Sequence, residues 1–393
     1  MLLEPQLGAE ARIHFFVIHS LMVSIPKRLV NSAGPTKRYR YQMLFDSLKE
    51  METSNRGSLP PAKQPTVKEV AELAGVSPMT VSRTLAGGKS VRPELQERVL
   101  RAVTMLGYHR NENARSIRPG QPSRLIGVAI TNIGNPYYGS LALGVEDVVS
   151  MHGRRMILGT TGEDLGRERQ LIADLIGRQI EGLILVPSGG GVDHLAPGRL
   201  REIPLVLASR LAEGISADAV LVDDVGGSLR ATRSLLQAGH RRVGYLGPAA
   251  STFTGRRRFE GFCLALAEFD QTYDPGIVRL GQQDADTAET AAIEILDGSP
   301  PTAIFCANNR NTVGALRAIA GLMSAGTGAD MLPAIVSFDS FELSELMPVV
   351  VTVIDHDARQ LGREAAQMLF ERLDGTFTGP ARTLELPTSV RTP

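Results

Sequence analysis

TVKEVAELAGVSPMTVSRTL, residues 66–85, contains two short amphipathic segments separated by a three-residue break. Thr66 and Glu69 have the spacing of a capping box, in which the threonine caps a helix and the glutamate reaches back to the helix start. The break, Gly75-Val76-Ser77, ends that first helix. Its buried face is predicted from apolar residues at helical spacing: Val67, Val70, Ala71 and Ala74.

The second segment begins with strong helix-start signals. Ser77 is predicted to cap it and Pro78 takes the first helical position, where a missing N–H costs nothing. Two short helices joined by a tight glycine-containing turn are typical of a helix-turn-helix, although any two amphipathic helices with such a turn give a similar pattern. In that motif the second helix enters the DNA major groove, Arg83 can bind guanine and Met79 can pack on base methyl groups. The predicted exposed face consists of Pro78, Met79, Thr80, Ser82 and Arg83.

Charge is distributed unevenly along the chain, although the formal net charge is zero. Residues 62–124 hold eleven Lys or Arg against five Asp or Glu, whereas residues 125–393 hold 23 against 32. A compact basic segment beside an acidic bulk is expected when one small module binds a polyanion, and a solvated basic surface is the simpler alternative. A third helix is predicted at 93–106, before a short basic stretch that ends at Pro119-Gly120.

Together with VRPELQERVLRAVTMLGY, residues 91–108, the opening stretch resembles the DNA-binding headpiece of the lactose/galactose repressor family. The resemblance implies a double-stranded operator DNA partner, with Thr66 and Ser77 joining the second helix in the contact. It also implies that residues 111–121 form a hinge helix and linker that bind the minor groove. Relatives insert a leucine where this chain has Ile117. The hinge residues implied in this way are Asn111, Ala114, Ile117 and Arg118.

From residue 125 onward, short apolar strands alternate with amphipathic helices, for example at 167–178, 226–238 and 284–296. This alternation predicts an α/β fold with two lobes of doubly wound parallel sheets, and the ligand of such a fold lies beyond the carboxyl ends of the strands. The predicted strands are 125–130, 156–160, 183–186, 205–208, 243–246, 303–306, 334–337 and 350–354.

This half resembles the periplasmic-binding-protein-like effector domain of the same family, on stretches such as RLIGVAITNIGNPYYGSLALGVE and PTAIFCANN. The resemblance implies that Tyr137 or Tyr138 stacks on an effector, with core filling as the alternative. It places Arg258, Asn308 and Asp339 on the ligand and Ser209 where relatives carry an aspartate. Asn309 and Ser340 also replace acidic residues, so a less negative cleft is expected. The predicted effector is a sugar, with a sugar acid or sugar phosphate favoured by that argument.

The Asp355-His356-Asp357 triplet suggests a metal site at first sight. Because it lies between the predicted strand at 350–354 and the last helix, a cleft-lining or capping role is preferred, and His356 is kept as an effector-site candidate. No metal or cofactor is predicted. Neither a Walker loop nor a GxSxG elbow is present, and the histidines are scattered, so we do not expect an enzyme.

The predicted domains are an extension at 1–60, a headpiece at 64–110, the hinge and linker at 111–121, and an effector-binding and dimerisation domain at 122–393. The extension is expected to be disordered or to reflect an early start codon, with Met51 as the alternative start. Its apolar run at 13–23 is too short to span a membrane, and Glu4 and Glu10 precede it where a secretion signal needs positive charge.

The remaining alternative is a transport-type sugar-binding protein of the same fold, which would carry a secretion signal and no headpiece. Two cysteines without a CxxC pair fit the cytoplasm. Tetrameric relatives carry a C-terminal helical extension with heptads, so a homodimer is expected. The sequence therefore predicts a cytoplasmic transcription repressor of carbohydrate-related genes, controlled by an effector bound between two lobes.

Overall fold

The computed structural model describes residues 65–85, 87, 91–108, 123–341 and 349–391. The chain divides into two units, with the division between Asn111 and Glu112. None of the helices in the described ranges combines the length and apolar composition that crossing a membrane requires.

The smaller unit contains three helices, α4 (Val67–Ala74), α5 (Pro78–Leu85) and α6 (Pro93–Leu106). The predicted capping box is present: the Glu69 N–H donates to Thr66 Oγ1 over 3.3 Å, and the Thr66 N–H donates to Glu69 Oε2 over 2.6 Å. Gly75 ends α4 at φ +64°, a conformation that favours glycine. The helix-turn-helix predicted from the sequence is therefore confirmed.

The core of this unit is small and drawn from all three helices. Thr84 is also buried, which the amphipathic pattern did not predict. Tyr108, just beyond the end of α6, closes the core at 8% exposure. The buried apolar residues are Val70, Ala71, Ala74, Val81, Val99, Ala102 and Tyr108.

The first lobe of the larger unit is a parallel six-stranded sheet in the order β11-β5-β4-β3-β1-β2. Helices α8 and α14 cover one face and α9 covers the other, because the side chains of β1 alternate between two apolar clusters. The elements of this lobe are β1 (Leu125–Ile130), α8 (Pro136–Met151), β2 (Arg155–Thr160), α9 (Leu165–Gly177), β3 (Gly182–Leu185), β4 (Leu205–Ala208), β5 (Asp218–Val222), α14 (Ala358–Leu373) and β11 (Thr383–Leu386).

The second lobe repeats this plan in the order β12-β10-β9-β8-β6-β7, with β12 antiparallel to β10. Helices α10 and α11 pack on one face of this sheet, and α12 and α13 on the other. Its elements are α10 (Asp224–Gln237), β6 (Val243–Gly247), α11 (Phe253–Ala267), β7 (Val278–Leu280), α12 (Ala285–Leu296), β8 (Ala303–Cys306), α13 (Asn309–Ser324), β9 (Ala334–Phe338), β10 (Val351–Asp355) and β12 (Ser389–Arg391).

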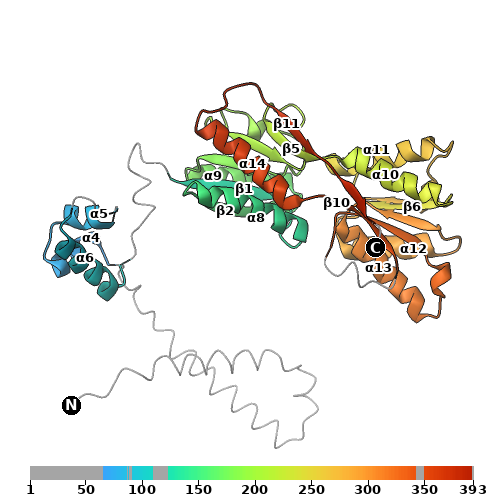
Figure 1. Cartoon of the computed structure of the whole chain (residues 1–393), viewed down its shortest axis with the longest axis horizontal. Helices are drawn as coiled ribbons and strands as arrows, with labels where there is room; N and C mark the ends of the chain where they lie inside the picture. Colours follow the sequence, from blue (N-terminus) through green and yellow to red (C-terminus); the bar gives the residue numbers. More distant parts are fainter. Residues whose placement is uncertain (1–64, 86, 88–90, 109–122, 342–348, 392–393) are drawn as a thin grey trace, which may run out of the picture. The chain divides into compact units, whose positions relative to one another are not determined.

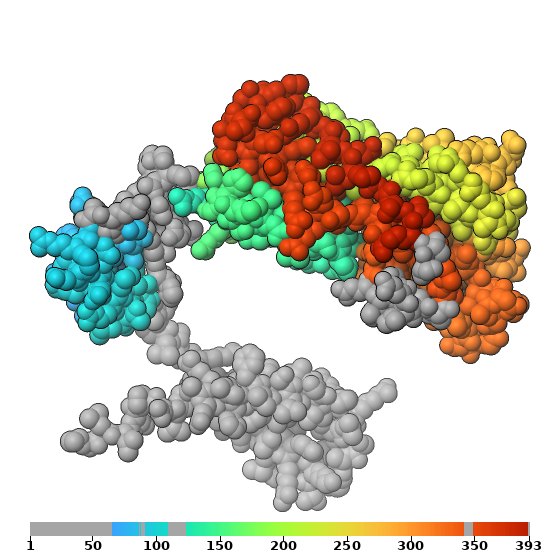
Figure 2. Space-filling model, in the orientation of Figure 1, coloured from blue at the N-terminus to red at the C-terminus, as the bar shows by residue number. Residues whose placement is uncertain are grey.

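The chain passes between the lobes three times, after β5, after β10 and between β11 and β12. Figure 1 shows the two sheets end to end, with the C-terminal strands running from one lobe into the other. In the space-filling view α14 and these strands, in red, lie at the surface and continue across the junction (Figure 2). These connections bring the carboxyl ends of both sheets to one cleft.

The predicted strands are all present, with ends shifted by at most one residue. The sequence pattern missed β5, β7, β11 and β12. Both β7 and β12 are three residues long, which is too short for a readable apolar pattern. The antiparallel β12 is a departure from the purely parallel sheets that were predicted.

Candidate functional site

The candidate DNA-binding surface is the solvent-facing side of α5. Met79 is 63% exposed, Pro78 and Arg83 are exposed, and Thr80 and Ser82 are half-buried. An exposed methionine and arginine one turn apart are available to base edges. Ser77 and Thr66 are exposed as well, but their hydroxyls accept hydrogen bonds from the Thr80 and Glu69 N–H groups as helix caps. The four predicted hinge residues, Asn111, Ala114, Ile117 and Arg118, lie outside the described residues.

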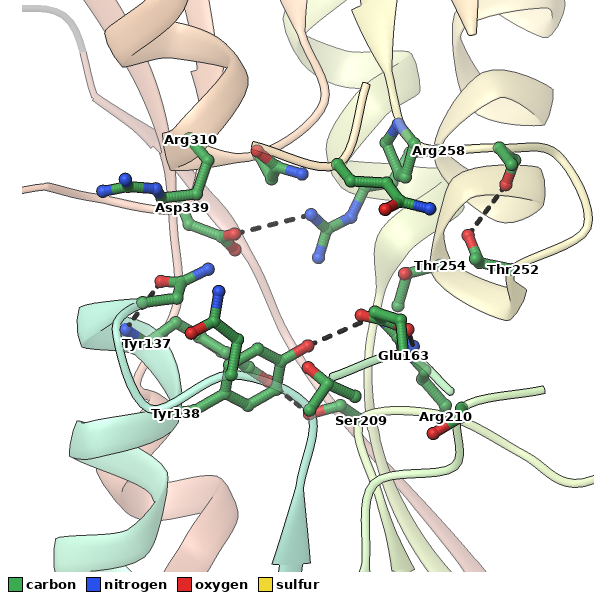
Figure 3. A pocket seen from close by; sticks show the side chains of 18 of the residues that line it. Tyr137, Tyr138, Glu163, Ser209, Arg210, Thr252, Thr254, Arg258, Arg310 and Asp339 are labelled. Atoms are coloured by element: carbon green, nitrogen blue, oxygen red, sulfur yellow. Dashed lines mark hydrogen bonds and ion pairs between the residues drawn. The ribbon is translucent and has the colours of Figure 1, made fainter. Parts of the chain in front are cut away.

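A cavity of about 230 Å³ lies between the two lobes. Its wall draws on the segment that follows the carboxyl end of almost every strand in both sheets, which is where the ligands of doubly wound folds bind. Figure 3 shows Tyr137, Tyr138 and Ser209 on one side and Arg258, Arg310 and Asp339 on the other. The polar and charged lining residues include Thr131, Asn135, Tyr137, Tyr138, Glu163, Ser188, Ser209, Arg210, Asp224, Thr254, Arg258, Gln282, Asn308, Arg310 and Asp339.

Arg258, on α11, is buried and held by the protein's own groups. Its Nε donates to Asp224 Oδ1 over 2.7 Å and its Nη1 to the Ala307 carbonyl over 2.6 Å, with Asp339 Oδ2 at 3.5 Å. Burial lowers the pKa of Arg258, but the carboxylates of Asp339 and Asp224 outweigh it and raise the pKa. Nη2 makes no hydrogen bond within the described residues, so it is the guanidinium nitrogen available to a ligand.

Asp339 follows β9 and accepts hydrogen bonds from two basic side chains. His356 Nε2 lies 2.8 Å from Asp339 Oδ1, and Arg258 approaches the other oxygen. Burial raises the pKa of Asp339, but Arg258 and His356 together lower it overall. The carboxylate is therefore ionised in the cleft and can accept hydrogen bonds from ligand hydroxyls.

His356 is placed behind the cavity wall. Its side chain is only 2% exposed and does not line the cavity between the lobes. In this cavity His356 therefore acts through Asp339, while it lines a separate cavity together with Tyr137 and Asp339. The neighbouring triplet members point elsewhere: Asp355 pairs with Arg391 over 2.9 Å, and Asp357 caps α14.

Asn308 caps α13 and also lines the cavity. Its Oδ1 accepts the Asn311 N–H over 2.8 Å, so only Nδ2 remains, with no partner in the part of the chain that the structure describes. The adjacent Asn309 has a different role. Its Nδ2 donates to Asn135 Oδ1 over 2.9 Å, a buried hydrogen bond that joins the lobes. Asn309 therefore supplies a contact between the lobes.

The first lobe contributes a second buried arginine. Arg210 donates to both oxygens of Glu163, over 2.6 and 2.9 Å, and to the Tyr138 hydroxyl over 3.3 Å. Tyr137 and Ser209 share a hydrogen bond between their hydroxyls. Both tyrosines line the cavity, so either one or both can contact an effector.

Three lining residues adopt the left-handed backbone region although none is glycine. The φ angles are +61° at Glu163, +63° at Ser209 and +68° at Asp339. Such conformations cost on the order of 1–3 kcal/mol and persist where the surroundings enforce them, often at ligand sites. Here they turn the three side chains into the cavity as the chain leaves β2, β4 and β9.

Sequence reasoning missed Glu163 and Asp224, although each follows a strand. With them, three arginines and three carboxylates line the cavity: Arg210, Arg258, Arg310, Glu163, Asp224 and Asp339. The lining is balanced in formal charge, and the expectation from the sequence was a cleft less negative than that of relatives. The uncharged residues at 209, 309 and 340 could be read from the sequence, whereas the pairing of Arg258 with Asp224 depends on the fold.

Each of the two units matches a known protein family. The model of "Bacterial regulatory proteins, lacI family" matches residues 66–111, and that of "Periplasmic binding proteins and sugar binding domain of LacI family" matches residues 123–388. The transcriptional regulator GalS of Salmonella typhimurium is 30% identical over 83% of this chain and 95% of its own. The regulator CelR of Thermobifida fusca is 31% identical over 84% of this chain and 98% of its own.

Solved structures give the same result. A CelR–cellobiose complex is 29% identical, with a TM-score of 0.60 over 84% of this chain and 98% of that one. A lac repressor dimer bound to operator, at 23% identity, has a TM-score of 0.69 over 84% of this chain and 98% of that one, and so shares the fold. A helix-turn-helix unit joined to a two-lobed ligand-binding unit defines a class of DNA-binding transcriptional regulators. The chain belongs to the lacI family of these bacterial regulators.

Proposed function

We propose that this regulator is a homodimeric repressor, acting in the cytoplasm, that binds a roughly palindromic operator and senses an uncharged sugar in the cleft between its lobes. The exposed face of α5 supports the DNA part, because it offers Met79 and Arg83 to base edges. The cleft carries the effector part. It presents Arg258 Nη2, Asn308 Nδ2 and the Asp339 carboxylate together, the mixture of donors and acceptors that binds hydroxyl groups.

The pairing of the buried arginines favours an uncharged effector over a sugar acid or sugar phosphate. Asp224 and Asp339 already compensate Arg258, and Glu163 compensates Arg210. An anionic ligand would meet these carboxylates at short range in a poorly solvated cavity, where repulsion between like charges is strong. A neutral polyol avoids that repulsion and keeps the hydrogen bonds.

Selection of operators from a random DNA pool tests the DNA part. We expect the full chain to enrich one palindromic sequence, and Arg83→Ala to lose preference at one base pair by ~1–3 kcal/mol because a guanine contact is removed. Arg101→Ala is the matched control, since Arg101 lies on α6 with its side chain 73% exposed. Failure of the parent protein to enrich any sequence would refute the repressor proposal.

Calorimetric titration tests the effector part. Glucose, galactose and ribose are compared with gluconate, galacturonate and glucose 6-phosphate. We expect binding among the neutral compounds and at least tenfold (~1.4 kcal/mol) weaker binding of the matched acids. Tighter binding of an acid would reverse the charge argument while leaving the cleft assignment in place.

A further inference from the structure

The cleft continues into a second cavity of about 210 Å³, beside the one described above. The two cavities share three wall residues, Ser188, Arg210 and Ser251, so they adjoin. Small-molecule sites occupy about 300–1,000 Å³, a range that neither cavity reaches alone and that the two reach together. A ligand confined to the first cavity would leave half of this space unused.

The wall of the second cavity suits a sugar ring. Phe253, at the start of α11, supplies an aromatic surface from one lobe, and Leu195, Leu211 and Ala212 supply apolar groups from the other. Polar and charged side chains complete the wall: Glu168, Ser188, Arg210, Glu213, Ser251 and Arg256. The N–H groups of Gly189, Gly190 and Gly191 add donors that make no hydrogen bond within the described residues. An aromatic surface beside polar side chains and fixed donors matches a ring that has apolar faces and hydroxylated edges.

The second cavity is bounded by contacts that both lobes make. Arg256 Nη2, on α11 of the second lobe, lies 2.7 Å from Glu213 Oε1 of the first lobe, and both residues line the cavity. Glu168 anchors the opposite wall: its carboxylate accepts the Ser188 N–H over 2.6 Å and contacts His194 Nε2 over 2.8 Å. These contacts hold the Ser188 loop and the α11 start on either side of one elongated space.

We propose that the effector is a disaccharide, with one ring in the cavity lined by Arg258 and Asp339 and the second ring against Phe253 in the adjoining cavity. This inference rests on the proposed sugar-sensing function and adds the length of the ligand to it. Ser188, Arg210 and Ser251 surround the glycosidic linkage, because they form the wall common to both cavities.

The test is calorimetric titration of the full chain with matched pairs: glucose with cellobiose, glucose with maltose, and galactose with lactose. For one pair we expect the disaccharide to bind about tenfold more tightly, since a second ring is buried on an aromatic wall. Val192→Phe should abolish that preference, because Val192 lines only the second cavity of the two and the larger side chain fills it. Phe253→Ala should reduce the preference as well.

Val350→Phe is the matched control, because Val350 is 63% exposed and lines neither cavity. It should keep the full disaccharide preference. Equal affinity for both members of every pair would refute the disaccharide inference and leave sugar sensing intact, as would a preference that survives Val192→Phe. If none of the sugars binds, the sugar-sensing proposal fails and the inference fails with it.

Discussion

The buried charge of Arg258 is compensated by carboxylates of the protein itself and does not require a ligand. Its side chain is 8% exposed, the Asp224 side chain is fully buried, and the guanidinium carbon lies 3.7 Å from the centre of the Phe338 ring. Burying charges is costly, and the cost is offset only by close, well-formed pairing. The Arg258–Asp224 pair is therefore part of the folding core of the second lobe as well as of the cleft.

Asp224→Asn should lower the free energy of unfolding by ~3 kcal/mol, because it leaves a buried guanidinium with Asp339 as its remaining charged partner. Urea unfolding followed by circular dichroism measures this. Asp286→Asn is the control: the Asp286 side chain is 88% exposed in its pair with Arg317, so a change of at most about 0.5 kcal/mol is expected. Equal effects of the two substitutions would contradict a structural role for the buried pair.

At the scale of elements, the helices pack in pairs through glycine. A methyl group at Gly144 of α8 would lie 1.9 Å from the Arg359 carbonyl oxygen of α14, and one at Gly362 would lie 2.1 Å from that of Leu141. Gly261 on α11 and Gly314 on α13 meet the backbones of α10 and α12 in the same way. Glycine weakens a helix locally by about 1 kcal/mol, so these positions are kept for close packing rather than for helix stability.

Gly144→Ala should destabilise the protein by ~1–3 kcal/mol, because α8 and α14 must move apart to admit the methyl group. Gly139→Ala is a control on the same helix. Nothing lies within 4 Å of a methyl group there, so a gain of about 0.5–1 kcal/mol is expected. The urea concentration at the unfolding midpoint, compared between each variant and the parent, measures both changes. Equal stability of the Gly144 and Gly139 variants would refute the close contact between α8 and α14.

The same helix pair carries a charge contact with a defined pH range. Asp147 on α8 accepts hydrogen bonds from Arg359 and Arg363 on α14, over 2.8–3.0 Å. The hydrogen bond from Arg359 is the main cause that lowers the pKa of Asp147 to about 2. The folded pKa of Asp147 is below its unfolded value of about 4. The ionised carboxylate therefore stabilises the fold fully above pH ~4, and this stabilisation is lost as the pH falls towards 2.

Asp147→Asn should therefore lower the melting temperature at pH 7, and the gap between variant and parent should close between about pH 4 and pH 2. Thermal unfolding of both proteins across this range measures the gap. A gap that stays constant down to pH 2 would show that the asparagine acts through packing and that ionisation of Asp147 contributes nothing.

At the scale of the whole molecule, the sequence predicted what depends on local pattern. Helix caps, buried strands and the positions just after them follow from short stretches, so Arg258, Asn308 and Asp339 could be assigned to one cleft. Contacts between distant segments could not be predicted. The pairing of Arg210 with Glu163, the Asn309–Asn135 hydrogen bond and the second cavity all depend on how the two lobes meet.

The charge distribution of the whole chain makes a last prediction: operator affinity should depend steeply on salt and effector affinity should not. Residues 62–124 carry an excess of six positive charges, doubled in the proposed dimer. If ~10 phosphates are neutralised, log K for the operator should fall with log salt at a slope near ~−9. Effector affinity should barely change, since a neutral sugar releases no counterions and the buried arginines of the cleft, Arg210 and Arg258, are paired within the protein.

Operator binding by fluorescence anisotropy and sugar binding by calorimetry, each from 50 to 300 mM potassium chloride, give the two slopes on one preparation. Arg83→Ala should keep nearly the parent slope on random DNA, because its guanine contact adds specificity rather than phosphate neutralisation. An operator slope near zero would contradict binding through the basic headpiece. A steep slope for a neutral sugar would mean that binding breaks or forms ion pairs of the protein, which would contradict a cleft whose buried pairs stay intact.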